Sequence, residues 1–158
     1  MIKVIPLLIA SSIFAQPVFF QPPIAQVFKV QAGKPICSKT IFNTVQTLQN
    51  VPRTKNVRFK TSDVRGYANV PAGKTKFYQF VFQGSGSDDI LNSPKMMETL
   101  AARVLLACNE SAVLTFNLDR SDAFEMYGWL NGKPQRFTCY PSTDKLPAKM
   151  PWGQRICL

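Results

Sequence analysis

The chain has 158 residues, enough for one domain of ordinary size, and its 19 basic and nine acidic residues give a net charge of +10. It contains no histidine, which excludes Ser-His and Cys-His nucleophile systems and most zinc hydrolases. The positive charge is uneven, because ten basic residues face one acidic residue between positions 27 and 87. Two interpretations follow: this half contacts something anionic, or it is a solvated basic face that only aids solubility.

The first 25 residues have the pattern of a secretory signal. Lys3 supplies the charged start, and residues 4–15 form an apolar run that is too short to span a bilayer as a helix. Ala15 and Ala25 are the two candidate cleavage positions. Because residues 16–26 are apolar and rich in proline, an uncleaved N-terminus that acts as an anchor is the alternative. We therefore expect a leader within residues 1–25, a single disulfide-bonded domain over residues 26–158, and a secreted or periplasmic location. Secretion argues against nucleic acid as a partner.

The four cysteines are spread along the chain. An even number of cysteines in a secreted protein predicts two disulfides. No two of them lie close in sequence, and histidine is absent, so neither a metal nor a cofactor is expected. The four are Cys37, Cys108, Cys139 and Cys157.

The first half of the chain is expected to form one short helix and three strands. In residues 37–48, Ile41, Val45 and Leu48 recur at helical spacing and predict a short N-terminal helix. The three predicted strands are residues 56–60, 63–70 and 75–83. The last is the strongest strand pattern in the chain, and it is largely apolar on both faces, so a central position in the sheet is predicted.

The principal helix is predicted over residues 94–107. Ser93 is a suitable N-cap, and Pro94 suits the first helical position. The helical spacing of the apolar residues places Cys108 on the buried side as well. The apolar stripe comprises Met97, Leu100, Ala101 and Val104.

A half-buried strand over residues 112–118 and a hairpin over residues 124–140 follow the principal helix, and a terminal strand is expected over residues 155–158. Asn131-Gly132 is the usual pair for a two-residue type I′ turn, and it sets the register of the hairpin. The predicted inward face comprises Phe124, Met126, Phe137 and Cys139. The predicted outward face comprises Glu125, Tyr127, Trp129, Arg136 and Thr138.

These elements predict an α+β fold with a small, mainly antiparallel β-sheet. A helix between the third and fourth strands resembles the order found in five-stranded oligomer-binding (OB-like) barrels. In element order alone, the chain also resembles the binding subunits of bacterial pentameric toxins. Because Cys108 lies on the helix stripe and Cys139 on the inward hairpin face, a bridge between them is predicted. That pairing leaves Cys37 with Cys157, and a Cys139–Cys157 bridge between neighbouring strands is the alternative.

Two groups of residues are candidate binding sites. Exposed aromatic rings beside arginine suit stacking on sugar rings or insertion at a membrane surface. The hairpin supplies Tyr127, Trp129 and Arg136 for such a site, with Trp152 in the adjoining loop, unless a second layer covers this face. The second candidate is a basic stripe that includes Arg58 and Lys60. These two side chains are expected to project to different faces of their strand, which weakens a concentrated anion site.

The sequence supports three hypotheses about function. The first is non-catalytic binding to an anionic or carbohydrate-like surface, as a monomer or a homo-oligomer. The second is a structural or inhibitory module that contacts a partner protein, and it predicts an apolar patch with little salt dependence. The third is a small hydrolase, which needs two carboxylates in one cleft. Its candidates are Asp119, Asp122 and Glu125.

Overall fold

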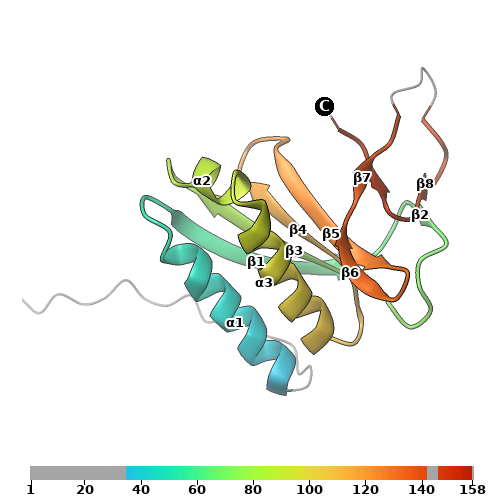
Figure 1. The fold of residues 1–158 in the computed structure, drawn as a ribbon, viewed down its shortest axis with the longest axis horizontal. Coiled ribbons are helices and arrows are strands. Elements are labelled where there is room, and N and C mark those ends of the chain that lie inside the picture. The colour runs from blue at the N-terminus through green and yellow to red at the C-terminus, as the bar shows by residue number, and fades with distance from the viewer. Residues whose placement is uncertain (1–34, 142–145, 158) are drawn as a thin grey trace, which may run out of the picture.

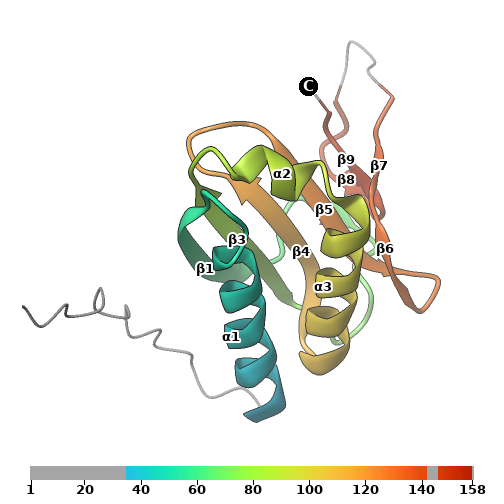
Figure 2. The same ribbon diagram turned by 60° about the vertical axis from the view of Figure 1, so that its left-hand side comes forward.

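A computed structural model describes residues 35–141 and 146–157, so the predicted leader over residues 1–25 lies outside the described residues. Two helices, α1 (Pro35–Gln49) and α3 (Pro94–Ala107), lie side by side over one face of a five-stranded sheet (Figures 1 and 2). The strands in spatial order are β1 (Lys55–Asp63), β3 (Lys76–Gln83), β4 (Ser111–Leu118), β5 (Phe124–Leu130) and β6 (Lys133–Arg136). The predicted α+β class, the principal helix and the short N-terminal helix are confirmed.

The sheet is open and is not closed into an OB-like barrel, because β1 and β6 are its two edges. Neighbouring strands are antiparallel except for β3 and β4, which run parallel. Parallel neighbours need a crossover connection, and α3 supplies it. The pattern of β3, apolar on both faces, fits its position between two other strands, as predicted.

The main core lies between the helices and the sheet. The sheet contributes large side chains at alternate positions, and the rings of Phe80 and Phe116 stack with centroids 5.7 Å apart. The predicted stripes of both helices are buried against these rings. The helical core residues are Ile41, Val45, Leu48, Met97, Leu100, Ala101 and Val104. Packing of these amphipathic stripes supplies most of the stability of such helices.

A C-terminal segment covers part of the opposite face of the sheet. It contains β7 (Thr138–Cys139), β8 (Met150–Pro151) and β9 (Gln154–Arg155); β7 pairs with β9, and β8 pairs with β2 (Tyr67–Ala68). These short pieces enclose a second cluster around Val113, Met126, Phe137 and Trp152. The predicted strand over residues 63–70 is too long. Residue 63 belongs to the end of β1, and only the two residues of β2 in the following loop pair with another strand. The predicted terminal strand is displaced to β9.

The predicted hairpin register is confirmed between β5 and β6. Leu130 pairs with Lys133 and Tyr127 with Arg136, and Asn131 and Gly132 have φ values of 51° and 74°, as a type I′ turn requires. The register fails farther from the turn, because Cys139 pairs with Arg155 and not with Phe124.

The predicted disulfide pairing is wrong, although both disulfides are present. Cys37 bonds to Cys108, and Cys139 bonds to Cys157. The apolar stripe correctly places Cys108 toward the core, but its neighbour there is Cys37 on α1 and not the hairpin. The second bridge is the alternative pairing, and it joins the C-terminal residues to β7.

A short helix, α2 (Ser87–Leu91), lies outside the predicted elements, and it follows a glycine-containing turn. The turn packs against the backbone after α1, so a Cβ at Gly86 would lie 2.0 Å from the carbonyl oxygen of Pro52. We expect Gly86→Ala to lower the free energy of unfolding by about 1–3 kcal/mol, as overpacking does. Urea unfolding would measure the loss, and Ser85→Ala at the exposed neighbouring position is the matched control. Equal stability of the two variants would contradict the close contact.

Candidate functional site

The aromatic residues of the predicted outward hairpin face do not form an exposed surface. Tyr127 is only 2% exposed, because α3 covers it, and its hydroxyl lies 3.5 Å from the carbonyl oxygen of Pro94. Burial raises the pKa of Tyr127 to about 12. The expectation that this side chain is free to stack on a ligand is therefore wrong: a helical layer covers the face.

The two tryptophans are also engaged within the fold. The half-buried Trp129 indole donates to the carbonyl oxygen of Ser111 at 2.9 Å, and the Lys74 Nζ lies 4.2 Å from the ring centroid. Trp152 donates to the carbonyl oxygen of Trp129 at 2.7 Å, but its ring packs in the second cluster, on the face opposite to the helices. The structure therefore does not bring Trp152 together with Tyr127 and Trp129 on one surface.

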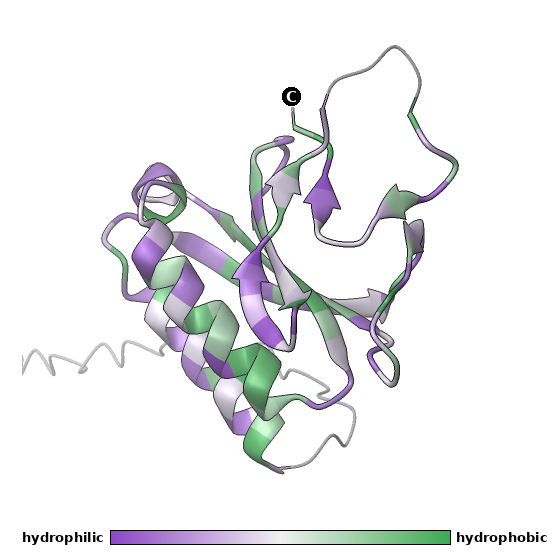
Figure 3. Cartoon of the chain, turned by 45° about the vertical axis from the view of Figure 1, so that its right-hand side comes forward, coloured by the Kyte–Doolittle hydropathy of each residue, from purple (hydrophilic) through white to green (hydrophobic). Residues whose placement is uncertain are grey.

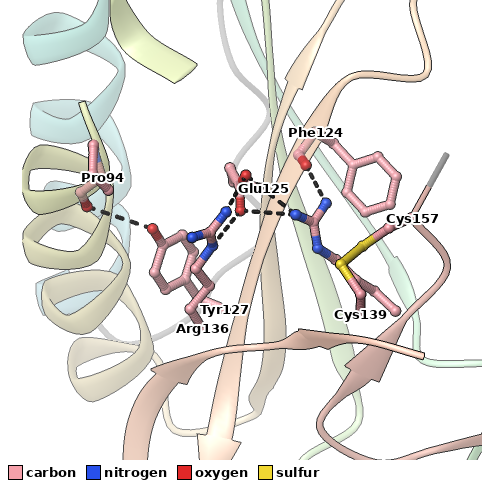
Figure 4. A network of polar contacts seen from close by, with 8 residues as sticks. Pro94, Phe124, Glu125, Tyr127, Arg136, Cys139 and Cys157 are labelled. Atoms are coloured by element: carbon pink, nitrogen blue, oxygen red, sulfur yellow. Dashed lines mark hydrogen bonds and ion pairs between the residues drawn. A yellow bond between two sulfur atoms is a disulfide. The ribbon is translucent and has the colours of Figure 1, made fainter. Parts of the chain in front are cut away.

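Arg136 belongs to a network in which two arginines share one carboxylate (Figure 4). Its Nε and Nη2 atoms each donate to Glu125 at 2.6 Å, while the Nη2 atom of Arg155 lies 3.2 Å from both Glu125 oxygens. Arg155 also donates to the carbonyl oxygen of Phe124 at 2.5 Å. Since the Glu125 and Arg155 side chains are only 15% and 11% exposed, the network fastens the C-terminal segment to β5.

Arg58 and Lys60 share one face of β1, contrary to the interpretation of the sequence. They are two residues apart in the strand, and residues at that spacing point the same way. Their partners in β3 are Val81 for Arg58 and Gln79 for Lys60. The intervening Phe59 packs against the helix-facing core, so Arg58 and Lys60 lie on the opposite face.

Further polar side chains continue across the sheet from this pair. Gln79 opposes Thr115 of β4, and Val81 opposes Asn117, whose amide donates to the Thr115 hydroxyl at 2.9 Å. We call this surface the polar sheet face. It comprises Arg58, Lys60, Gln79, Gln83, Asn117 and Asp119, whereas Thr115 is only 1% exposed and lies beneath it.

Positive charge is concentrated at one end of the polar sheet face. Asp119 accepts from Arg58 at 2.7 Å and from the Gln83 side-chain amide. The Gln83 hydrogen bond, and then the charges of Arg58, Arg120 and Lys60, lower the pKa of Asp119. Arg58 is in contact with Asp119, and the charges of Arg120 and Lys60 also act on this carboxylate, while Lys60 itself is exposed to solvent. Such an arrangement can hold an anionic group.

The three carboxylates suggested by the hydrolase hypothesis do not form an acid–base pair. Asp119 is held by Arg58, whereas Glu125 is held by Arg136 and Arg155. Asp122 lies in the exposed turn between β4 and β5. Among residues 35–141 and 146–157, no group of three or more His, Cys, Asp or Glu side chains could hold a metal ion.

The polar sheet face is missed by the sequence interpretation, although its signal is present there. Gln79 interrupts an otherwise apolar strand, and Thr115 and Asn117 alternate with the buried residues of the next strand. Their proximity to Arg58 and Lys60 depends on the order of β1, β3 and β4 in the sheet, which only the structure supplies.

Comparison of the chain with protein-family models, curated proteins and solved structures finds no match. In the part of the chain that the structure describes, no helix combines the length and the apolar character needed to cross a membrane.

Proposed function

We propose that this is a non-catalytic binding protein that holds an acidic polysaccharide against its polar sheet face. The observation that carries the proposal is that Arg58 and Lys60 share one face of β1, where Arg58 meets the carboxylate of Asp119 and the charge of Arg120 also acts on it. Arginine and lysine donate charge-assisted hydrogen bonds to sulfate and carboxylate groups. The neighbouring amides of Gln79 and Asn117 can donate to, and accept from, sugar hydroxyls.

The chemistry of this face favours a glycan over a lipid surface. Membrane insertion needs exposed apolar side chains. The large hydrophobic residues that are exposed in the described part of the chain lie elsewhere, on α1, on α3 and in the C-terminal segment. They are Ile36, Phe42, Leu106, Leu146 and Ile156.

We also propose that the protein is secreted or periplasmic. The two disulfides support this location, because such bonds form and persist in oxidising compartments. The leader pattern of residues 1–25 supports it independently.

Retention on immobilised heparin tests the glycan proposal. We expect the double variant Lys60→Gln, Arg120→Gln to bind about tenfold more weakly, because each lost surface ion pair contributes up to about 1 kcal/mol. The matched control is Lys39→Gln, Lys95→Gln, which removes the same charge from exposed helical positions. Binding would be measured at two salt concentrations.

Equal weakening in both double variants would show that heparin senses only bulk charge, and it would overturn the assignment of this face. Retention on vesicles of phosphatidylglycerol without retention on heparin would overturn the choice of a glycan. Weakening confined to the Lys60, Arg120 variant supports the proposal.

A protein-interaction module is the second candidate, favoured by the exposed apolar side chains of the helical layer. Ile36 and Phe42 on α1 are 69% and 55% exposed, and Leu106 on α3 is 62% exposed. Leu106 also lines a groove of about 420 Å³ between the two helices. This alternative predicts a protein partner whose binding is insensitive to salt and is weakened by Phe42→Ala.

A further inference from the structure

A cavity of about 300 Å³ lies between the C-terminal segment and the sheet. Phe124 and Met126 of β5 contribute to its lining, together with Tyr67 of β2. The C-terminal segment supplies Leu146, Arg155 and Ile156. Figure 3 shows that the elements of this segment differ in hydropathy: β9 is hydrophilic, whereas β8 includes a hydrophobic residue.

The lining is mainly apolar, yet part of it remains open to water. Leu146 is 55% exposed and Ile156 is 45% exposed, although both contribute to the cavity. Covering such side chains with an apolar molecule is favourable, because apolar surface is then removed from water. Concave, mainly apolar sites with a few polar groups are typical of small-molecule binding.

Two polar groups of the lining have hydrogen-bonding capacity that the described residues do not fully use. The Tyr67 hydroxyl lies 3.1 Å from the Met126 sulfur, and a thioether is a weak acceptor. The Nε atom of Arg155 is buried and has no hydrogen-bond partner in the described part of the chain. A ligand oxygen could therefore accept a hydrogen bond from the Tyr67 hydroxyl in place of the Met126 sulfur, whereas the Arg155 Nε is covered by the protein and contributes only its positive charge.

The charges beside the cavity favour an anion. Arg155 and Arg136 share the single carboxylate of Glu125, which leaves one positive charge in excess. Partly buried charges are screened less by salt than those on an open surface. An acidic group in the cavity would thus compensate a charge that Glu125 alone does not balance.

We propose that this cavity binds a small molecule with an apolar body and one carboxylate, such as a medium-chain alkanoate. The apolar body contacts Phe124, Met126 and Leu146, and the carboxylate accepts from Tyr67 and is attracted by the charge of Arg155. The site is separate from the polar sheet face, and the proposal does not depend on glycan binding.

Titration of the full, disulfide-intact chain with decanoate, decanol and acetate tests the proposal by calorimetry. We expect saturable binding of decanoate, binding of decanol that is about tenfold weaker, and no binding of acetate, because a hydrogen bond to a charged group contributes about 1.5–3 kcal/mol. Absence of saturable decanoate binding, or equal binding of decanol, would overturn the proposal.

Variants locate the site. Tyr67→Phe keeps the ring and removes the hydroxyl, so it should weaken decanoate binding about tenfold and leave decanol binding unchanged. Leu146→Glu places a like charge at an exposed position of the lining and should abolish decanoate binding, whereas Leu106→Glu, at a similarly exposed position on α3, should not. Lys60→Gln, Arg120→Gln should also bind decanoate normally. Loss of binding in that double variant, or normal binding by Leu146→Glu, would overturn the location.

Discussion

Replacing Cys37 and Cys108 together with alanine is expected to lower the free energy of unfolding by about 4 kcal/mol. The bond joins residues 71 positions apart, so it restricts a large part of the unfolded chain. It also joins the start of α1 to the end of α3. Both cysteines are buried, since Cys37 is 7% exposed and Cys108 is 2% exposed. Urea unfolding of the oxidised protein and of the double variant measures the difference.

The Cys139, Cys157 pair is the matched control. Its residues are 18 positions apart, so the same entropy argument gives about 3 kcal/mol for its loss. That loss is confined to the C-terminal segment, and we expect α1 and α3 to remain packed on the sheet. The interpretation is contradicted if removal of Cys37–Cys108 destabilises the protein no more than removal of Cys139–Cys157.

Glu125→Gln is expected to lower the free energy of unfolding by about 3 kcal/mol, since it leaves a nearly buried arginine without its carboxylate. Arg155 is 11% exposed, and it would keep the carbonyl oxygen of Phe124 and one neutral amide oxygen at position 125 as acceptors, with no negative charge to balance it. The two arginines would then repel each other without an intervening negative charge. Chemical denaturation measures the stability, and limited proteolysis shows whether the C-terminal segment has loosened.

Two further variants separate this effect from the general loss of an ion pair. Asp63→Asn breaks an exposed pair with Lys76 and should leave the unfolding midpoint nearly unchanged. Adding Arg155→Leu to Glu125→Gln removes the uncompensated charge and should recover part of the lost stability. If Glu125→Gln behaved like Asp63→Asn, Glu125 would have no part in fastening the segment.

Local patterns predicted the elements that depend on neighbouring residues. Pro94 and the apolar stripe predicted α3, although the Ser93 hydroxyl makes no cap hydrogen bond and donates instead to the carbonyl oxygen of Asp89. Asn131-Gly132 predicted the register of the hairpin near its turn. The helical stripe and the turn pair act over a few residues, so they depend little on the segments that pack around them. The same patterns could not predict α2, whose turn is shaped by close contact with Pro52.

The candidate sites depended on packing between distant segments, and the predictions of which side chains are exposed there were wrong. Alternation correctly grouped Tyr127 with Trp129, but it could not show that α3 covers that face. The disulfide pairing required the knowledge that α1 lies beside α3. Arg58 and Lys60 were predicted to lie on different faces of their strand, so no site near Asp119 was expected. Arg58 meets Asp119 because β1, β3 and β4 are neighbours in the sheet.

Within residues 35–141 and 146–157, no strand pairs with the outer edge of β1, and this has a consequence for self-association. An unpaired edge strand offers its backbone to another chain, and proteins discourage this with lysines and bulges. β1 carries Lys55 and Lys60, and its pairing with β3 is irregular between Lys55 and Arg58. A second molecule that extended the sheet there would bring these cations together on a distorted strand. Lys60, which contributes to the charge of the polar sheet face, thus also disfavours edge-to-edge pairing.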